Sequence, residues 1–224
     1  MDKKLYMVSL GAGDIDLLTI KALKALKNSD VICVPTKSSD NSFTKSLTYK
    51  IVKNVMIEHN FSKPIIPVYT PMHFKKEDWQ YQVDIIMEAF TTNKTVSFVT
   101  LGDAAVYSTV YYLLDLIKIQ NINLYNNCEV CEGITSFSNA SAKVKKPLCV
   151  GDSSFSIVPL LDKEVANTTV YMRPKIGMDT KSIKEQGEIY TFEDLNYPDE
   201  TITPYKKAKT SKYMTIFIDF FKRG

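Results

Sequence analysis

The sequence predicts an α/β protein of two domains, and three observations support this prediction. Apolar runs of strand length alternate with segments of helical periodicity over the first part of the chain. One of these runs, at 31–35, is apolar throughout, as is typical of a parallel strand covered on both faces. Towards the C-terminus, strand-like stretches outnumber helical ones, which indicates a second sheet. We therefore expect a mainly parallel N-terminal sheet and a mixed C-terminal sheet.

The first domain is expected to alternate strands with helices that have one apolar face. Its segment at 64–68 contains Pro64 and Pro67, which cannot donate to a central ladder, so this segment predicts a strand at the sheet edge. In chain order, the expected elements are a strand ending at 8–10, helix 20–26, strand 31–35, helix 43–55, strand 64–68, helix 79–90, strand 95–100 and helix 111–117.

A polar, asparagine-rich segment at 120–127 follows the last of these helices and is the best candidate for a domain junction. We expect an N-terminal α/β domain over 1–120 and a C-terminal α/β domain over 121–224. The strands expected in the second domain are 128–131, 169–172, 188–192 and 213–221.

Composition narrows the class of protein. A chain of 224 residues that is 45% hydrophobic can bury one large core or two small ones. Its formal charge of +3 indicates neither a nucleic-acid partner nor a membrane surface. No apolar run approaches the roughly 20 residues of a membrane span, and the start lacks the apolar core of a signal peptide. A cytoplasmic protein is expected.

The cysteines are Cys33, Cys128, Cys131 and Cys149, and all have apolar or strand-like neighbours. Reduced, buried thiols are therefore expected rather than a disulfide scaffold. Cys128 and Cys131 share the spacing of redox and zinc motifs, but no second pair, nearby histidine or helix start accompanies them. The two histidines lie in no metal-ligand pattern, and we expect no metal site.

Glycine turns follow predicted strands three times, at 11–14, 102–105 and 133–136. In open α/β sheets, ligands bind at the carboxyl ends of strands, and glycine lets a ligand approach the backbone closely. Together, the three turns predict a binding cleft. Tight turning would explain the glycines without a ligand, and helix capping would explain Thr135 and Ser136 in the same way.

A nicotinamide dinucleotide fold is the obvious alternative, because Gly11 and Gly13 follow a strand and precede a helix. However, Asp16 stands in place of the third glycine of that fingerprint, and no carboxylate ends the second strand. A Walker lysine motif is also absent. The sequence therefore supports neither dinucleotide binding nor phosphoryl transfer.

The first two loops resemble motifs of the tetrapyrrole methyltransferase superfamily. Its first motif, GxGPGDPxLLT, corresponds to residues 9–19, where Ser9 replaces the first glycine and an alanine and an isoleucine replace two prolines. Its second motif, GDPxxYST, corresponds to residues 102–109, where Ala104 replaces the proline. In both motifs the register matches throughout.

The third loop resembles the third motif of the same superfamily. PGITSF corresponds to residues 132–137, with Glu132 in the proline position, and PLxxGD corresponds to residues 147–152. The motifs occur in order over most of the chain, so the resemblance is specific. Tyr-Ser-Thr in the second motif, Ser-Phe in the third and Tyr-Met-Thr at 213–215 resemble the precorrin-2 carbon-20 methyltransferase branch.

This resemblance implies two α/β domains with the active site in the cleft between them, and a homodimer. It implies an enzyme that binds S-adenosylmethionine and methylates carbon 20 of precorrin-2 or cobalt-precorrin-2 in cobalamin (vitamin B12) biosynthesis. Matching positions would contact the cofactor through Leu10, Gly102, Asp103, Val106, Tyr107, Ser108, Thr135, Ser136 and Met172. The tetrapyrrole would face Gly11, Gly13, Asp14 and Pro35.

The resemblance identifies no catalytic acid or base, and alignment of an activated methyl donor can supply much of the rate without one. Two alternatives stay open. The first is another enzyme of the superfamily, such as a methyltransferase for a different corrin carbon or a diphthine synthase. The second is a non-catalytic binder of a tetrapyrrole or a nucleotide.

Overall fold

The computed structural model describes residues 3–44, 46–71, 73, 75–150, 154–157, 168–171, 174–183, 187–194, 198–212 and 215–220. Contacts divide the chain into two units, Met1–Phe155 and Ser156–Gly224. Each unit has its own hydrophobic core, and together they confirm the predicted α/β class.

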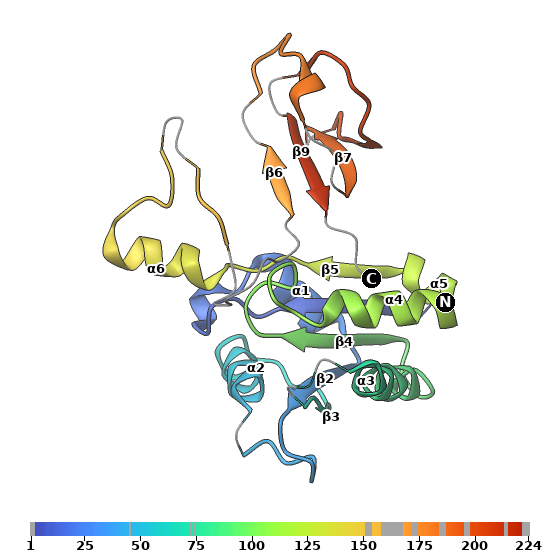
Figure 1. Cartoon of the computed structure of the whole chain (residues 1–224). Helices are drawn as coiled ribbons and strands as arrows, with labels where there is room; N and C mark the ends of the chain where they lie inside the picture. Colours follow the sequence, from blue (N-terminus) through green and yellow to red (C-terminus); the bar gives the residue numbers. More distant parts are fainter. Residues whose placement is uncertain are drawn as a thin grey trace. The chain divides into compact units, whose positions relative to one another are not determined.

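The first unit contains a five-stranded sheet in the order β3-β2-β4-β1-β5 (Figure 1), and every neighbouring pair is parallel. The expected parallel sheet is confirmed, as is the edge position of the proline-containing strand β3. The strands are β1 (Lys4–Ser9), β2 (Val31–Thr36), β3 (Ile65–Tyr69), β4 (Thr95–Thr100) and β5 (Cys128–Cys131).

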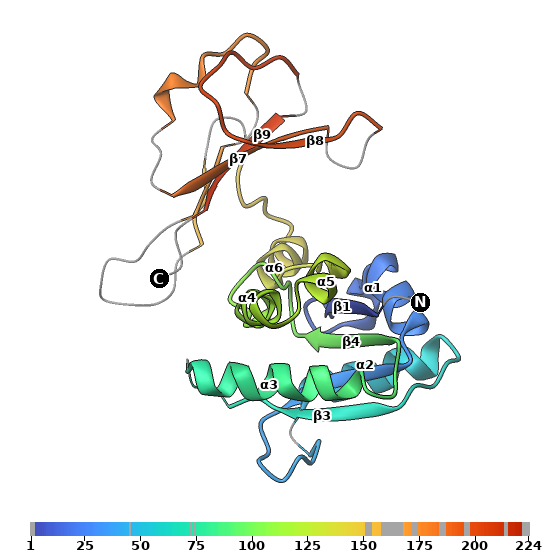
Figure 2. The same cartoon turned by 90° about the vertical axis from the view of Figure 1, so that its right-hand side faces the viewer.

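Helices cover both faces of this sheet (Figure 2). Helices α1 and α2 pack on one face, and α3 and α4 pack on the other. No helix in the described part of the chain is long and apolar enough to cross a membrane. The helices of this unit are α1 (Ile20–Asn28), α2 (Leu47–Glu58), α3 (Lys76–Ala89), α4 (Val110–Gln120), α5 (Ile122–Asn126) and α6 (Ser136–Val144).

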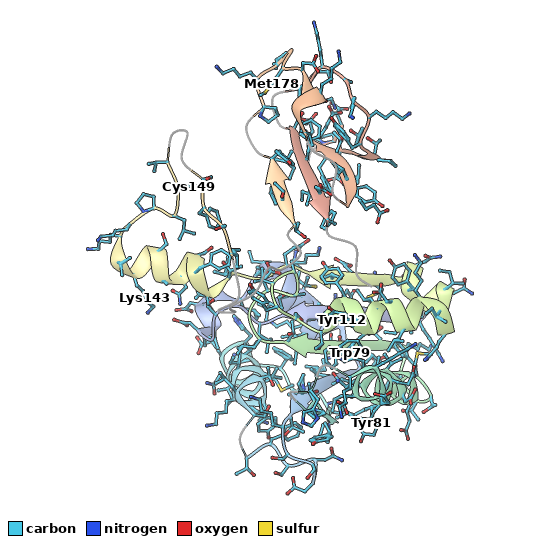
Figure 3. The ribbon with its side chains drawn as sticks, in the orientation of Figure 1. Trp79, Tyr81, Tyr112, Lys143, Cys149 and Met178 are labelled. Atoms are coloured by element: carbon cyan, nitrogen blue, oxygen red, sulfur yellow. The ribbon has the colours of Figure 1, made fainter. Side chains whose placement is uncertain are left out.

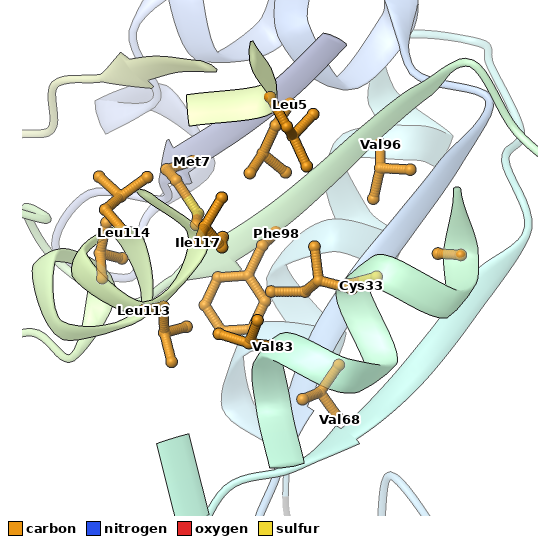
Figure 4. Close-up of a cluster of buried hydrophobic side chains, with 14 of the residues drawn as sticks. Leu5, Met7, Cys33, Val68, Val83, Val96, Phe98, Leu113, Leu114 and Ile117 are labelled. Carbon is orange, nitrogen blue, oxygen red and sulfur yellow. The ribbon is translucent and has the colours of Figure 1, made fainter. Parts of the chain in front are cut away.

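Successive residues of the central strands serve the two faces alternately, because side chains on a strand point to opposite sides of the sheet. Met7 and Phe98 belong to the core beneath α3 and α4 (Figure 4), whereas Val8 and Val99 belong to the core beneath α1 and α2. All four side chains are almost completely buried. Burial on both faces explains why these strands are continuous apolar runs in the sequence.

An aromatic pair joins the helices of one face. Trp79 on α3 stacks on Tyr112 on α4, with 4.3 Å between the ring centroids (Figure 3). The pair adds a directional contact to the apolar packing of these helices.

The second helix begins later than the apolar spacing predicts. The expected helix 43–55 includes Phe43, but α2 begins at Leu47 because the Ser46 side chain accepts a hydrogen bond from the Tyr49 N–H and caps the helix. Phe43 instead stacks on Tyr49 from the preceding loop, at 4.2 Å. Its apolar spacing therefore reflects packing against the helix rather than membership of it.

The division between the units lies later in the chain than the expected boundary near residue 120. The asparagine-rich segment forms the short helix α5, which Asn121 caps by accepting from the Leu124 N–H. The following strand β5 pairs with β1, so it completes the first sheet rather than starting the second. The polar residues at this point cap and turn the chain within one unit.

The second unit contains a four-stranded sheet in the order β6-β9-β7-β8, with every described pair antiparallel. The expected mixed sheet therefore differs from the described one in strand direction. Its core contains Ile183, Ile189 and Phe217. Strand β8 was not expected, and it is exposed at the sheet edge. The strands are β6 (Thr169–Tyr171), β7 (Glu188–Glu193), β8 (Thr201–Pro204) and β9 (Thr215–Phe220).

A carboxylate ties the turn before β2 to the start of β4. Asp30 Oδ2 accepts hydrogen bonds from the Thr95 N–H at 2.8 Å and the Lys94 N–H at 2.9 Å. These two bonds, that of Thr95 first, hold the pKa of the Asp30 carboxyl below its usual value. Because the folded-state pKa is lowered, the bonds stabilise the fold above the unfolded-state pKa, and this contribution disappears as the pH falls through the folded-state pKa.

We therefore expect Asp30→Asn to lower the Tm at pH 7 by about 2 °C or less, since the site is exposed to solvent and screened. The deficit should shrink as the pH falls and vanish once the wild-type carboxyl is protonated. Thermal unfolding measured from pH 7 to pH 3 checks this. Glu58→Gln at an exposed position on α2 is the control for loss of one negative charge. A deficit that does not change with pH would contradict the assignment.

Candidate functional site

Three loops meet at the carboxyl ends of neighbouring strands in the first unit. β1 lies between β4 and β5 in the sheet, so the segments that follow these strands leave the same edge side by side. We call them the first loop (10–19), the second loop (101–109) and the third loop (132–135). They contain the three glycine turns that the sequence indicates.

The backbones of the first and second loops are hydrogen-bonded to each other. The Gly11 N–H donates to Gly102 O at 3.1 Å, and the Gly102 N–H donates to Gly11 O at 2.9 Å. Both residues have positive φ, +71° and +75°, which glycine adopts without steric cost. A Cβ atom on Gly11 would also lie 2.7 Å from Leu17 O. The two turns are therefore one rigid structure.

The third loop packs directly onto this pair. A Cβ atom on Gly133 would lie 2.5 Å from Gly102 O and 2.6 Å from the Ser9 Cβ. Here glycine is required by close approach of the chains. We call this three-way contact among Ser9, Gly102 and Gly133 the loop junction.

Next to the loop junction, part of the backbone is open. A Cβ atom on Gly102 or on Gly13 would meet no other atom within 4 Å. The contrast with Gly133 is informative, because tight packing does not account for the glycine at 102. The positive φ of Gly102 is what favours glycine at this position, and the space beside its backbone is open.

The second loop presents a strained and exposed aromatic residue. Tyr107 has φ of +50°, a conformation that costs a bulky residue roughly 1–2 kcal/mol, and its side chain is 71% exposed. The loop around it is internally bonded: the Asp103 carboxylate accepts from the Ala105 N–H, and the Val106 N–H donates to Asp103 O. A strained backbone that displays an exposed ring is typical of ligand-binding loops.

Ser108, Thr135 and Ser136 lie at the starts of helices. Ser108 Oγ accepts from the Val110 N–H at the first turn of α4 and lies 3.2 Å from Thr100 Oγ1. Thr135 Oγ1 accepts from the Ser138 N–H and caps α6, whose first residue is the exposed Ser136. Helix capping thus explains Thr135 structurally, while Ser136 is exposed.

The remaining sequence-predicted residues are distributed more widely. Leu10 is completely buried just after the end of β1. Asp14 caps the 3-10 helix η1 (Ile15–Leu17) by accepting from the Asp16 N–H, and it is exposed next to Gly13. Pro35 lies on β2, across β4 from β1, and its carbonyl accepts from the hydroxyls of Ser46 and Thr48. Met172 lies outside the described residues.

Ser9 was not predicted as a site residue. Its side chain is completely buried, and its Oγ accepts from the Ala104 N–H at 2.9 Å. In the sequence, Ser9 and Ala104 each differ from the residue that the motif has at that position. The two differences together are the signal from which a contact between these residues could have been predicted.

An ionic contact braces the third loop against α1. Lys21 Nζ lies 3.1 Å from the Glu132 carboxylate and 3.5 Å from that of Glu129. Partial burial lowers the pKa of Lys21, but the hydrogen bond and charge of Glu132 outweigh it, so the pKa is raised overall. The Thr19 hydroxyl also donates to Glu132 O. Glu132, which replaces a motif proline, is thus held by neighbours in the first unit.

Burial determines the state of the Cys128 and Cys131 thiols. It raises the pKa of Cys128 to about 12 and that of Cys131 to about 11, so both stay protonated at neutral pH and are poor nucleophiles and metal ligands. The four cysteines are free thiols. Among the residues described, no three His, Cys, Asp or Glu side chains gather as a metal site would require.

Known proteins and one protein family resemble this chain in sequence. Residues 4–204 match the sequence profile of a family described as Tetrapyrrole (Corrin/Porphyrin) Methylases. A probable cobalt-precorrin-2 C(20)-methyltransferase from Methanocaldococcus jannaschii is 30% identical over 184 residues, which cover 82% of this chain and 75% of the relative. A cobalt-precorrin-2 C(20)-methyltransferase from Salmonella typhimurium is 29% identical, covering 70% of this chain and 64% of the relative.

A further relative and a solved structure agree with this pattern. A precorrin-2 C(20)-methyltransferase from a Sinorhizobium species is 25% identical, covering 81% of this chain and 76% of the relative. The crystal structure of a cobalamin synthesis related protein (CobF) from Corynebacterium diphtheriae superimposes with a TM-score of 0.53 at 14% identity, covering 97% and 98% of the two chains. This last likeness supports the fold alone.

We expect Gly133→Ala to destabilise the first unit by about 3 kcal/mol or more, because the added methyl group would meet the backbone carbonyl of Gly102, which cannot rotate away. Urea unfolding measures the loss. Ala105→Ser, which adds one atom at an exposed position of the second loop, is the matched control and should unfold like wild type. Equal stability of the Gly133→Ala variant and wild type would rule out the close approach.

Proposed function

Because the chain belongs to the tetrapyrrole (corrin/porphyrin) methylase family, we propose that it transfers a methyl group from S-adenosylmethionine to carbon 20 of precorrin-2 or cobalt-precorrin-2 in cobalamin biosynthesis. The observation that carries this proposal is the loop junction with its open backbone at Gly102, formed by the motif residues themselves. Three relatives with carbon-20 methyltransferase names support the choice of substrate.

The open backbone fits S-adenosylmethionine. The space beside Gly102 is open, and Asp103, Val106 and Tyr107 follow it on a loop that is held by its own hydrogen bonds. We assign the donor to this loop, with Leu10, Ser108, Thr135 and Ser136 as further contacts.

When bound, S-adenosylmethionine supplies a methyl group already activated as a sulfonium, so the protein needs to position more than to activate. The rigid loop junction meets this need, because alignment of two reactants can supply about 7–11 kcal/mol of the barrier. We assign Gly11, Gly13, Asp14 and Pro35 to the tetrapyrrole side. Carbon 20 of the reduced macrocycle gains the methyl and loses its proton, and any cobalt enters with the substrate.

The direct test incubates the purified protein without oxygen with S-adenosylmethionine and either precorrin-2 or its cobalt-loaded form. We expect one added methyl by mass, located at carbon 20 by NMR, and S-adenosylhomocysteine as the second product. A methyl group at a different corrin carbon would contradict the assignment of the reaction to carbon 20. Binding of the donor without transfer to either tetrapyrrole would contradict the proposed function.

The variant Tyr107→Ala tests, in a binding measurement, whether the exposed ring contacts the donor. Loss of a stacking aromatic group should raise the Kd for S-adenosylhomocysteine about tenfold, with little change in Tm because the ring is mostly exposed. Tyr81→Ala on α3 removes another exposed ring and is the control (Figure 3). Equal Kd values for the two variants would remove Tyr107 from the site.

We also propose that the protein is a cytoplasmic homodimer. None of the residues of α6 is buried. The segment from the end of α6 to Phe155, which we call the arm, has four exposed apolar residues among those described, Val144, Leu148, Val150 and Phe155. Exposed apolar side chains in one segment are typical of an interface, and a second copy is the partner that the family resemblance implies. The buried free thiols of Cys33 and Cys131 suit a reducing compartment.

Light scattering coupled to gel filtration should therefore give a mass of about twice 25.4 kDa. Leu148→Asp places a charge in the exposed arm and should shift the mass towards that of one chain. Ile119→Asp makes the same kind of change at an exposed position of α4 and should not shift it. A monomeric wild type would contradict the dimer without bearing on the reaction.

A further inference from the structure

A buried hydrogen bond joins the end of β1 to the second loop. Ser9 ends β1, and its Oγ accepts a hydrogen bond from the Ala104 N–H at 2.9 Å. Ser9 is completely buried and Ala104 is 1% exposed. Water therefore does not compete for this bond, and each partner depends on the other to satisfy its polar group.

The two residues replace the glycine and the proline that the corresponding motif positions usually hold. Glycine has no hydroxyl to accept the bond, and proline has no N–H to donate it. The usual pair of residues could not form this contact, whereas Ser9 and Ala104 form it together. Proline restricts φ of the chain by its ring, so the serine–alanine pair replaces a covalent restraint with a hydrogen bond.

The Ser9–Ala104 hydrogen bond holds the second loop two residues after Gly102. Gly102 is already tied to Gly11 by two backbone hydrogen bonds. The Ser9 bond fixes the next turn, directly after Asp103 and before Val106. With both attachments in place, the open face at Gly102 and the loop residues after it have one fixed arrangement relative to β1.

We propose that Ser9 is a positioning residue, which acts through the Ala104 N–H to hold the second loop in its donor-binding form. This inference rests on the proposed function, because it takes the second loop as the site of S-adenosylmethionine. The proposal makes the residues at 9 and 104 interdependent. Serine at 9 needs an N–H at 104, and alanine at 104 needs a hydroxyl at 9.

The two single reversions fail for different physical reasons. Ser9→Gly leaves the Ala104 N–H buried without a partner. Ala104→Pro removes the donor and directs a ring carbon at Ser9 Oγ, which lies 2.9 Å from the nitrogen in the wild type. The double variant Ser9→Gly/Ala104→Pro removes the hydroxyl and the N–H together, so neither group is left buried without its partner, and the oxygen that the ring would meet is gone.

The experiment is a double-mutant cycle on the full chain with two readouts, the Kd for S-adenosylhomocysteine by calorimetry and the Tm. We expect each single variant to raise the Kd about tenfold and the double variant to lie within about twofold of wild type. Ser9→Ala removes the acceptor while keeping Cβ, and should also raise the Kd about tenfold, which provides a test without proline.

Ser97→Ala is the matched control. Ser97 is a completely buried serine in the interior of β4, and its hydroxyl bonds to that of Ser29, away from the three loops. Loss of this hydroxyl should lower the Tm, as Ser9→Ala should, but leave the Kd unchanged. The comparison separates positioning of the loop from general stability of the sheet.

The outcomes distinguish this inference from the function on which it rests. Wild type that fails to bind S-adenosylhomocysteine overturns the proposed function. Wild type that binds it, with additive effects of the two reversions or with an unchanged Kd in Ser9→Ala, overturns the role of Ser9 alone. Rescue of binding in the double variant, together with an unaffected Kd in Ser97→Ala, supports it.

Discussion

The candidate site depends on one constraint, the approach of three backbone segments to within contact at the loop junction. Gly11 and Gly102 bond to each other in both directions, and Gly133 leaves no room for a side chain between Gly102 and Ser9. Such contacts cannot be loosened by a change of rotamer, because the atoms that meet belong largely to the main chain. Three loops that would otherwise move independently thus form one platform.

The parallel sheet makes this approach possible. β1 lies between β4 and β5, and the two registers are continuous along the strands, so the three strand ends arrive at the same level. The cores on both faces fix that arrangement through Met7 and Phe98 on one side and Val8 and Val99 on the other. Apolar burial thus makes the sheet rigid. The polar groups at the carboxyl ends of its strands are therefore not needed to hold the sheet together and can bind a ligand.

The buried, rigid part of the site and its exposed part consist of different residues. Ser9 at the end of β1 and Ala104 within the second loop are removed from water, whereas Tyr107 on the same loop is exposed and has a strained backbone. The strain is sustained because the turn around it is held by Asp103, Ala105 and Val106. A binding surface of this kind is preorganised, which reduces the entropy lost when a ligand binds.

The sequence by itself determined the strands of the first sheet, the edge position of β3 and the three glycine turns, because apolar period, proline chemistry and glycine conformation act over a few residues. It placed the boundary at the asparagine-rich segment, since local polarity does not reveal that Cys128–Cys131 pairs with β1. Likewise, Ser9 was visible as an altered motif position, but its partner lies 95 residues away. Only the tertiary structure decided these points, because hydrogen bonds and close contacts between distant segments exist only once the chain has folded.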